Sequence, residues 1–186
     1  GGDDIFTGYR RHMVLNSIKK SKIIPVNLFN AIFKIIPIRN PSLRRIKKLF
    51  YSFSQVGLYK VYSLFEWIPF EHSVKLFKNS SEITRFDFFK KLMTKKTLTN
   101  FTLEDFLMLE KKTFLVDHNL NYTDKMGMAE GVEIRVPFLD NDLVEFVERI
   151  PGKYKIRHGE AKYILKRVAE RYLPKEVIYR EKTGFG

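Results

Sequence analysis

The chain has 186 residues, a net charge of +13 and no cysteine. This length is enough for one domain with a buried core. The lack of cysteine excludes disulfides, thiolate metal sites and a cysteine nucleophile within these residues. Apolar residues make up 44%, a normal share for a globular protein, and no run approaches the roughly 20 apolar residues of a membrane span. The acidic, glycine-rich start does not have the character of an export signal, so we expect a cytoplasmic chain, cut at both ends.

The charge is unevenly distributed along the chain. Residues 1–100 carry 19 basic and 6 acidic side chains, whereas residues 101–186 carry 15 of each. No acidic residue occurs between Asp4 and Glu66. The asymmetry favours a solvated basic face, or one that meets an acidic surface elsewhere in the polypeptide. A basic helical module over residues 10–48 that binds nucleic acid or anionic lipid is the alternative from another class of function.

Hydrophobic periodicity predicts helices through most of the first half. Pro41 suits the first turn of a helix, where its missing N–H costs little. The stretch 78–100, rich in Lys, Ser, Thr and Asn, is the best candidate for a linker. The expected helices cover residues 4–20, 26–36, 41–53 and 57–67, with weaker signals over 69–78 and 84–94.

Capping signals organise the second half. Thr102 and Asp105 have the spacing of a capping box and predict a helix to about Val116. A further helix over residues 120–130 should end at Gly131.

Residues 132–139 are expected to be irregular, because Pro137 disfavours a helical Val136. Asp140 then caps a helix whose buried face comprises Leu143, Phe146, Val147 and Ile150. A last helix is predicted from Glu160 to Tyr172, closed by Pro174. No alternating strand pattern persists beyond four or five residues, so we expect a mainly α fragment with few or no strands.

Three segments carry candidate chemistry. The first reads Gly-Gly-Asp-Asp-Ile-Phe-Thr-Gly-Tyr and begins at Gly1. Two glycines, Gly1 and Gly2, allow a phosphate to approach the backbone, and Asp3 and Asp4 are suitable oxygen ligands for Mg2+. Taken alone, the segment is better explained as a glycine turn whose carboxylates suit a helix N-terminus.

The second segment runs from Asp124 to Asp140. Its small residues, Gly127, Ala129 and Gly131, permit tight backbone contact. Met126 and Met128 are predicted to fill the core. Glu133 and Arg135 lie two apart, so an extended chain places them on one face. They could pair with each other or face a zwitterionic substrate, and a buried structural ion pair is at least as well favoured.

The third segment closes the chain and contains Arg180 and Lys182 just before a Gly-Phe-Gly turn. A lysine on such a loop can offset the charge that develops on phosphates in a transition state. On composition alone, an exposed basic tail is the better explanation.

Together and in this order, the three segments resemble the asparagine synthetase family. The matching motifs are Gly-Gly-Asp-Glu-Leu-Phe-Gly-Gly-Tyr, Asp-Arg-Met-Ser-Met-Ala-x-Gly-x-Glu-x-Arg-x-Pro-Phe-Leu-Asp, and Arg-x-Lys-x-Gly-Phe-Gly. The resemblance covers residues 1–12 and 114–186. Residues 13–113 are interpreted as a basic helical insert. It implies the helical C-terminal part of a synthetase domain of the adenine-nucleotide α-hydrolase-like (ATP pyrophosphatase) fold.

The resemblance also implies an activity. Members hydrolyse glutamine in a separate domain, use ATP and Mg2+ to activate aspartate as β-aspartyl-AMP, and release asparagine after ammonia attacks. By position, Asp3 and Asp4 match metal-ligating carboxylates, while Lys182, with Arg180 beside it, matches the phosphate-contacting lysine. Asp117 and Asp124 would border the substrate pocket; Glu133 and Arg135 match largely structural motif positions. The expected partners are the rest of the polypeptide and aspartate or another carboxylate acceptor, with a homodimer left open.

Some features depart from the family pattern. Thr7 stands where members often have Gly, and Gly127 where they often have Ser. The Ser-Gly-Gly-x-Asp-Ser nucleotide loop and the glutaminase nucleophile do not occur in this sequence. We therefore expect this fragment alone to have no synthetase activity and to bind ATP weakly or not at all. The basic insert leaves room for a different acceptor, such as a sugar acid or a peptide or β-lactam precursor that closes a ring.

Overall fold

The computed structural model describes residues 2–20, 25, 27–28, 31, 35, 41–66, 68–77 and 98–181. The chain divides into two compact units, which are considered separately. Unit 1 comprises residues 1–13 and 103–186, and unit 2 comprises residues 14–102. The predicted helix over 84–94 and most of the one over 26–36 lie outside the described residues.

Unit 1 begins with a short 3-10 helix, η1 (Gly2–Phe6), followed by α1 (Arg10–Lys20), which continues into unit 2. The prediction of one helix over residues 4–20 was wrong, because the chain turns between these elements. Thr7 at this turn has a φ of 78°, in the left-handed region that a helix cannot contain.

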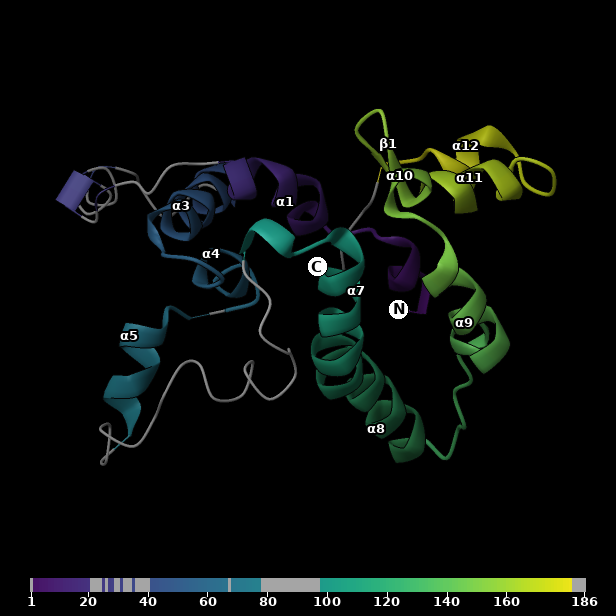
Figure 1. The fold of residues 1–186 in the computed structure, drawn as a ribbon. Coiled ribbons are helices and arrows are strands. Elements are labelled where there is room, and N and C mark those ends of the chain that lie inside the picture. Colours follow the sequence, from purple (N-terminus) through teal and green to yellow (C-terminus); the bar gives the residue numbers. More distant parts are fainter. Residues whose placement is uncertain are drawn as a thin grey trace. The chain divides into compact units, whose positions relative to one another are not determined.

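A long helical run forms the next part of unit 1 (Figure 1). It consists of α7 (Leu103–Glu110), the π-helix η5 (Lys111–Leu120) and α8 (Asn121–Ala129). The two helices predicted over residues 102–116 and 120–130 are therefore joined. The predicted end of the second was right: the chain leaves the helix at Glu130, and Gly131 has a φ of 66°.

After the irregular residues 132–136 come η6 (Pro137–Leu139) and α9 (Asn141–Arg149). The predicted cap is confirmed, since Asp140 Oδ1 accepts hydrogen bonds from the backbone N–H groups of Asp142 (3.1 Å) and Leu143 (3.2 Å). Val147 is buried as expected, but Phe146 is 62% exposed, so the predicted buried face was wrong at that position.

The C-terminal part of unit 1 contains α10 (Gly152–Lys155), the strands β1 (Ile156–Arg157) and β2 (Glu160–Ala161), α11 (Tyr163–Ala169) and α12 (Lys175–Ile178). The strands pair antiparallel, with Ile156 opposite Ala161. The helix predicted from Glu160 to Tyr172 starts too early, and α12 follows beyond it. The predicted fold class, mainly α with few strands, is confirmed.

Unit 2 is also helical. Its described elements are α3 (Pro41–Ser54), α4 (Tyr59–Tyr62), α5 (Phe70–Ser73), and the 3-10 helices η2 (Val74–Leu76) and η4 (Leu98–Asn100). The start of α3 at Pro41 was predicted correctly, whereas α4 and α5 are shorter than expected. Among the described residues, no helix combines the length and the apolar character required to cross a bilayer.

The core of unit 1 holds the first motif in place. Ile5 and Phe6 of η1 are buried in one cluster with Leu115 of η5 and with Val147 and Ile150. This burial of apolar area is the main force that fixes the first motif against η5 and α9.

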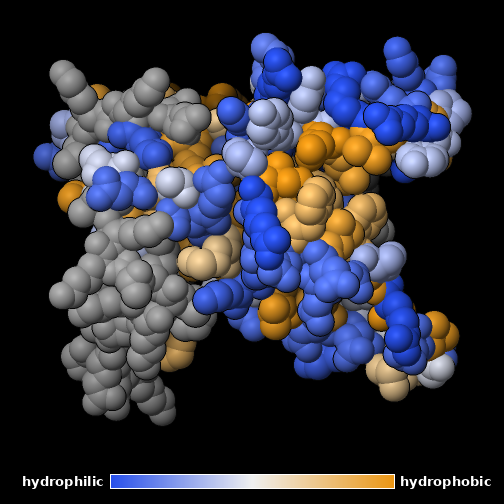
Figure 2. Space-filling view, turned by 45° about the vertical axis from the view of Figure 1, so that its right-hand side comes forward, coloured by the Kyte–Doolittle hydropathy of each residue, from blue (hydrophilic) through white to orange (hydrophobic). Residues whose placement is uncertain are grey.

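Part of the second motif remains exposed. Apolar side chains reach the surface of the molecule between hydrophilic ones (Figure 2). In this motif they are Met126, Met128, Val132 and Ile134, each at least 45% exposed. The two methionines were predicted to fill the core, and that prediction was wrong.

Candidate functional site

The turn after η1 is the centre of the candidate site. The N–H of Thr7 donates to the carbonyl of Asp4 at 2.9 Å, which closes the turn. The Thr7 hydroxyl donates to the carbonyl of Lys155 at 3.3 Å and accepts the backbone N–H of Lys162 at 3.0 Å. A threonine therefore occupies a left-handed position that suits glycine, and its hydroxyl ties the first motif to the chain before α11.

Lys162 places a cation beside the first motif. It has a φ of 58° and immediately precedes α11, and its ammonium pairs with Asp3 Oδ2. Gly8 makes this position possible, because a Cβ there would lie 2.5 Å from Cε of Lys162. The Asp3 side chain is 38% exposed, so a carboxylate with an adjacent ammonium faces solvent at this turn.

Asp4 has a different environment from Asp3. It is only 5% exposed. Its Oδ2 accepts hydrogen bonds from the Tyr9 hydroxyl (2.9 Å) and from Asn119 Nδ2 (3.2 Å), and that amide also lies 3.2 Å from the Tyr9 hydroxyl. Burial raises the pKa of Tyr9, which keeps the phenol a proton donor. Through these hydrogen bonds, Asp4 anchors the turn.

A buried histidine, His12, supports the turn through a hydrogen bond. The N–H of Gly8 donates to Nδ1 of His12 at 3.2 Å, so Nε2 carries the proton that faces Glu110 Oε2. Burial, reinforced by the charges of Arg11 and Lys162, lowers the pKa of His12 to about 3. The imidazole is therefore neutral at physiological pH and acts as a fixed link between a backbone N–H and a carboxylate.

Arg11 supplies the charge that balances Glu110. Its guanidinium pairs with Glu110 Oε1, and Glu110 is itself buried. The guanidinium also lies over the rings of Tyr9, at 4.1 Å, and Phe114, at 4.6 Å, where cation–π attraction contributes. These contacts hold the start of α1 on the α7–η5 run, so the residues that flank the turn are rigidly placed.

The turn can contribute to a magnesium site. Mg2+ commonly takes one or two protein carboxylates and completes its shell with phosphate oxygens and water. Asp3 is the accessible carboxylate of the turn, and Asp4 is engaged by Tyr9 and Asn119. Within the described ranges, no group of three or more His, Cys, Asp or Glu side chains is arranged to hold a metal ion by itself. The residues fit a shared site that is completed by a phosphate ligand.

The other predicted residues lie apart from the turn or outside the description. Gly1 and Lys182 are among the residues not described, so the predicted convergence of Asp3 and Lys182 stays a prediction. Arg180 follows α12 and is exposed. The Gly2 backbone lies in η1, and Gly2 is buried.

Two predicted substrate residues lie on the α7–η5–α8 run. Asp117 in η5 is exposed. Asp124 in α8 lines an open hollow of about 380 Å³ together with Ile134 and Val136. A role for either carboxylate in substrate binding stays a prediction.

Glu133 and Arg135 pair with each other, as one of the predictions held. The Arg135 guanidinium lies 2.9 Å from the Glu133 carboxylate. The Arg135 and Glu133 side chains are 82% and 71% exposed, so the alternative of a buried pair is wrong for this chain. Such an exposed pair contributes little to stability.

Arg11, His12, Glu110, Asn119 and Lys162 belong to the candidate site but were not predicted from the sequence. Glu110 did leave a signal, because it falls among Phe106, Leu107 and Phe114 on the apolar stripe of its helix, where an unpartnered charge would be costly. His12 lies four residues after Gly8, a spacing that allows a local side-chain contact. Lys162 and Asn119 left no comparable signal, because their contacts are made with residues 159 and 115 positions away.

Known proteins are similar to this chain over its whole length. A profile of the asparagine synthase family matches residues 1–186. Asparagine synthetase [glutamine-hydrolyzing] 1 of Bacillus subtilis is 27% identical over 192 residues, which cover 100% of this chain and 29% of that protein.

Shorter matches reach higher identity. The asparagine synthetase [glutamine-hydrolyzing] 3 of Bacillus subtilis is 39% identical over 66 residues, 36% of this chain and 11% of the relative. The asparagine synthetase of Gallus gallus is 35% identical over 80 residues, 41% of this chain and 14% of the relative. No solved structure matches. This chain spans at most about a third of the relatives it matches, and it belongs to the asparagine synthase family.

Proposed function

We propose that this chain forms part of an ATP-dependent, glutamine-hydrolysing amidotransferase that makes asparagine from aspartate. Family membership supports the reaction class, and the names of the relatives support aspartate and glutamine as substrates. The observation that carries the proposal within this chain is the pairing of Asp3 with Lys162 at a rigid turn. A carboxylate and an ammonium side by side are the groups needed to hold a metal-bound polyphosphate.

The proposed chemistry has two steps. In the first, an oxygen of the β-carboxylate of aspartate attacks the α-phosphorus of ATP, and the bond to pyrophosphate breaks. In the second, the lone pair of ammonia attacks the acyl carbon of β-aspartyl-AMP, the bond to AMP breaks, and a proton passes to solvent. Adenylation thus replaces a poor leaving group by a good one.

The residues of this chain would act on the first step by electrostatics. Bound Mg2+ would offset negative charge on the phosphates. Asp3 is the carboxylate placed to hold it, and Lys162 would turn its ammonium from Asp3 to a phosphate oxygen. Lys182 and Arg180 are proposed to add cationic contacts from the C-terminal loop. Thr7, Gly8 and His12 hold the turn in position.

The acceptor can be identified by pyrophosphate exchange. The polypeptide that contains this chain would be incubated with ATP, Mg2+ and labelled pyrophosphate, with aspartate, a sugar acid or a carboxylated peptide as the acceptor. We expect label to enter ATP only with aspartate, and asparagine to form when glutamine or ammonia is added. Exchange with another acceptor alone would favour the variant that amidates a different carboxylate. Exchange with none of them would contradict the proposed reaction.

A further inference from the structure

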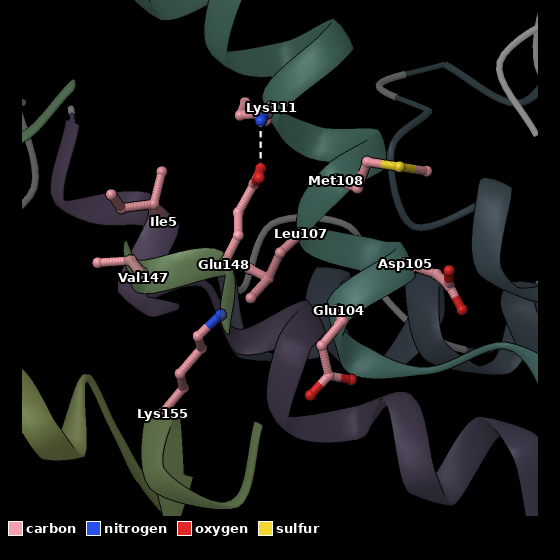
Figure 3. Close-up of a pocket in the computed structure, with 9 residues that line it drawn as sticks. All are labelled: Ile5, Glu104, Asp105, Leu107, Met108, Lys111, Val147, Glu148 and Lys155. Atoms are coloured by element: carbon pink, nitrogen blue, oxygen red, sulfur yellow. Dashed lines mark hydrogen bonds and ion pairs between the residues drawn. The ribbon is translucent and has the colours of Figure 1, made fainter. Parts of the chain in front are cut away.

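A second site lies where α7, α9 and α10 meet (Figure 3). A pocket of about 230 Å³ opens there. Ile5, Leu107 and Val147 form an apolar wall, and Met108 lines the pocket from another side of α7 (Figure 3). The volume is small for a nucleotide and suits a ligand of a few heavy atoms with an aliphatic part.

A buried lysine points into this pocket. Lys155 is only 2% exposed, and its side chain points toward the part of α9 that carries Val147 and Glu148 (Figure 3). Within the described part of the chain, no hydrogen bond or ion pair reaches its ammonium. Burial lowers the pKa of Lys155, and the charges of Glu104 and Glu148 act in the opposite direction. Because the ammonium has no direct partner there, a ligand that supplies an acceptor would be bound favourably.

The remaining charges of the pocket select the type of ligand. Three carboxylates, Glu104, Asp105 and Glu148, line it together with Lys111 and Lys155. Lys111 pairs with Glu148, and Glu104 accepts the backbone N–H of Gly152 at 2.6 Å. A ligand with negative charge alone would meet more carboxylates than ammonium groups. A ligand with one charge of each sign would complement both.

We propose that this pocket binds a small aliphatic α-amino acid as its zwitterion, with the carboxylate on Lys155 and the ammonium toward Glu104. The apolar wall of Ile5, Leu107 and Val147 receives the side chain. The inference does not depend on the proposed synthetase reaction. It needs only the pocket, its charges and the unpartnered amine.

Calorimetry with three matched probes tests the proposal on the full chain. L-valine carries both charges, 3-methylbutanoate lacks its amino group, and 2-methylpropylamine lacks its carboxylate. We expect L-valine to bind at least about tenfold more tightly than either analogue, since each lost charged contact is worth about that much. Lys155→Met should weaken L-valine about tenfold or more. Lys153→Met, an exposed lysine on the same helix, should leave its affinity unchanged.

Trace acetylation tests the proposal on the unmodified chain, so its result does not depend on whether the Lys155→Met variant folds. Acetic anhydride at low concentration labels amines in proportion to their accessibility and neutral fraction, and mass spectrometry reads each lysine separately. We expect L-valine to slow labelling of Lys155 several-fold and to leave Lys153 unaffected. No protection of Lys155 by L-valine would overturn the proposal. So would equal binding of 3-methylbutanoate, or an unchanged affinity in a folded Lys155→Met protein.

Discussion

The ammonium of Lys162 pairs with the carboxylate of Asp3, although the two residues are 159 positions apart in the sequence. The contact places a cation beside the carboxylate best exposed to a metal ion. Both side chains retain access to solvent, and the pair can open when a phosphate competes for the ammonium. The pair therefore has the properties of a preorganised ligand site.

Replacement of Lys162 should impair adenylation in the polypeptide that contains this chain. We expect Lys162→Met to lower kcat for pyrophosphate exchange by roughly 10²- to 10³-fold, the usual effect of removing one group that stabilises transition-state charge. Lys166→Met is the control, because that lysine on the same helix pairs with Glu160 at 3.0 Å. Equal exchange rates in both variants would show that Lys162 has no part in the reaction.

Gly8→Ala offers a second route to the same contact. The added Cβ would lie 2.5 Å from Cε of Lys162 and would push that side chain away from Asp3. The variant retains both charges, so a fall in exchange rate would report the position of the ammonium.

The neutral state of His12 should make stability depend on pH. Its pKa is about 3 in the folded chain and near 6.5 in an unfolded one. Between these values the unfolded chain binds the additional proton, so stability is full above about pH 6.5 and is lost as pH falls toward 3. The loss is about 1.4 kcal/mol per pH unit in this window. Urea denaturation at a series of pH values measures it.

Matched variants separate the contribution of His12 to the pH dependence of stability from the contribution of carboxylates that titrate in the same range. We expect His12→Gln to lower stability at pH 7, because a buried hydrogen-bonded group is lost, and to flatten the curve between pH 6.5 and 4. His158→Asn changes an exposed histidine at a φ of 50°, which asparagine tolerates. That control should keep the original slope, and an equally steep curve in His12→Gln would contradict the assignment.

Thr7 links the turn to Lys155 and Lys162 through one hydroxyl. Thr7→Val keeps the shape and the strained backbone but leaves the half-buried N–H of Lys162 without its acceptor. We expect it to lower the free energy of unfolding by about 1 to 3 kcal/mol, the usual cost of an unsatisfied buried group. Thr7→Ser retains the hydroxyl and should come much closer to the original stability in urea denaturation. Equal loss in both variants would mean that the methyl contacts, and not the hydrogen bonds, hold the turn.

Local signals in the sequence predicted local structure well. Asp140 caps α9 because its side chain bonds to N–H groups two and three residues ahead, and such an interaction is visible in the sequence itself. Pro41 is a second local signal, because a proline suits the first turn of a helix, and α3 starts at this residue. The family motifs point to Asp3 and Asp4 as metal ligands, and that role stays a prediction.

Long-range contacts explain the predictions that failed. The break at Thr7 was not predicted, because its backbone conformation is stabilised by bonds to residues about 150 positions away. Lys162 lies at the start of an ordinary amphipathic helix, and only the fold brings it to Asp3. Phe146 fits the helical period of α9 but projects to the surface, because the core of unit 1 receives Val147 and Ile150.

Gly127 is the small residue of the second motif on which packing depends most. A Cβ at this position would lie 2.6 Å from the carbonyl oxygen of Val132 and 2.8 Å from Cδ1 of Ile134. The carbonyl belongs to the backbone and cannot move without shifting the chain after α8. We therefore expect Gly127→Ala to lower the free energy of unfolding by about 1 to 3 kcal/mol, as overpacking does, despite the better helix propensity of alanine. Ala129→Ser, which adds one atom at an exposed position of the same helix, should change stability by about 0.5 kcal/mol at most. A Gly127→Ala protein as stable as the original in urea would show that the segment from Val132 to Ile134 can move away from α8 at little cost.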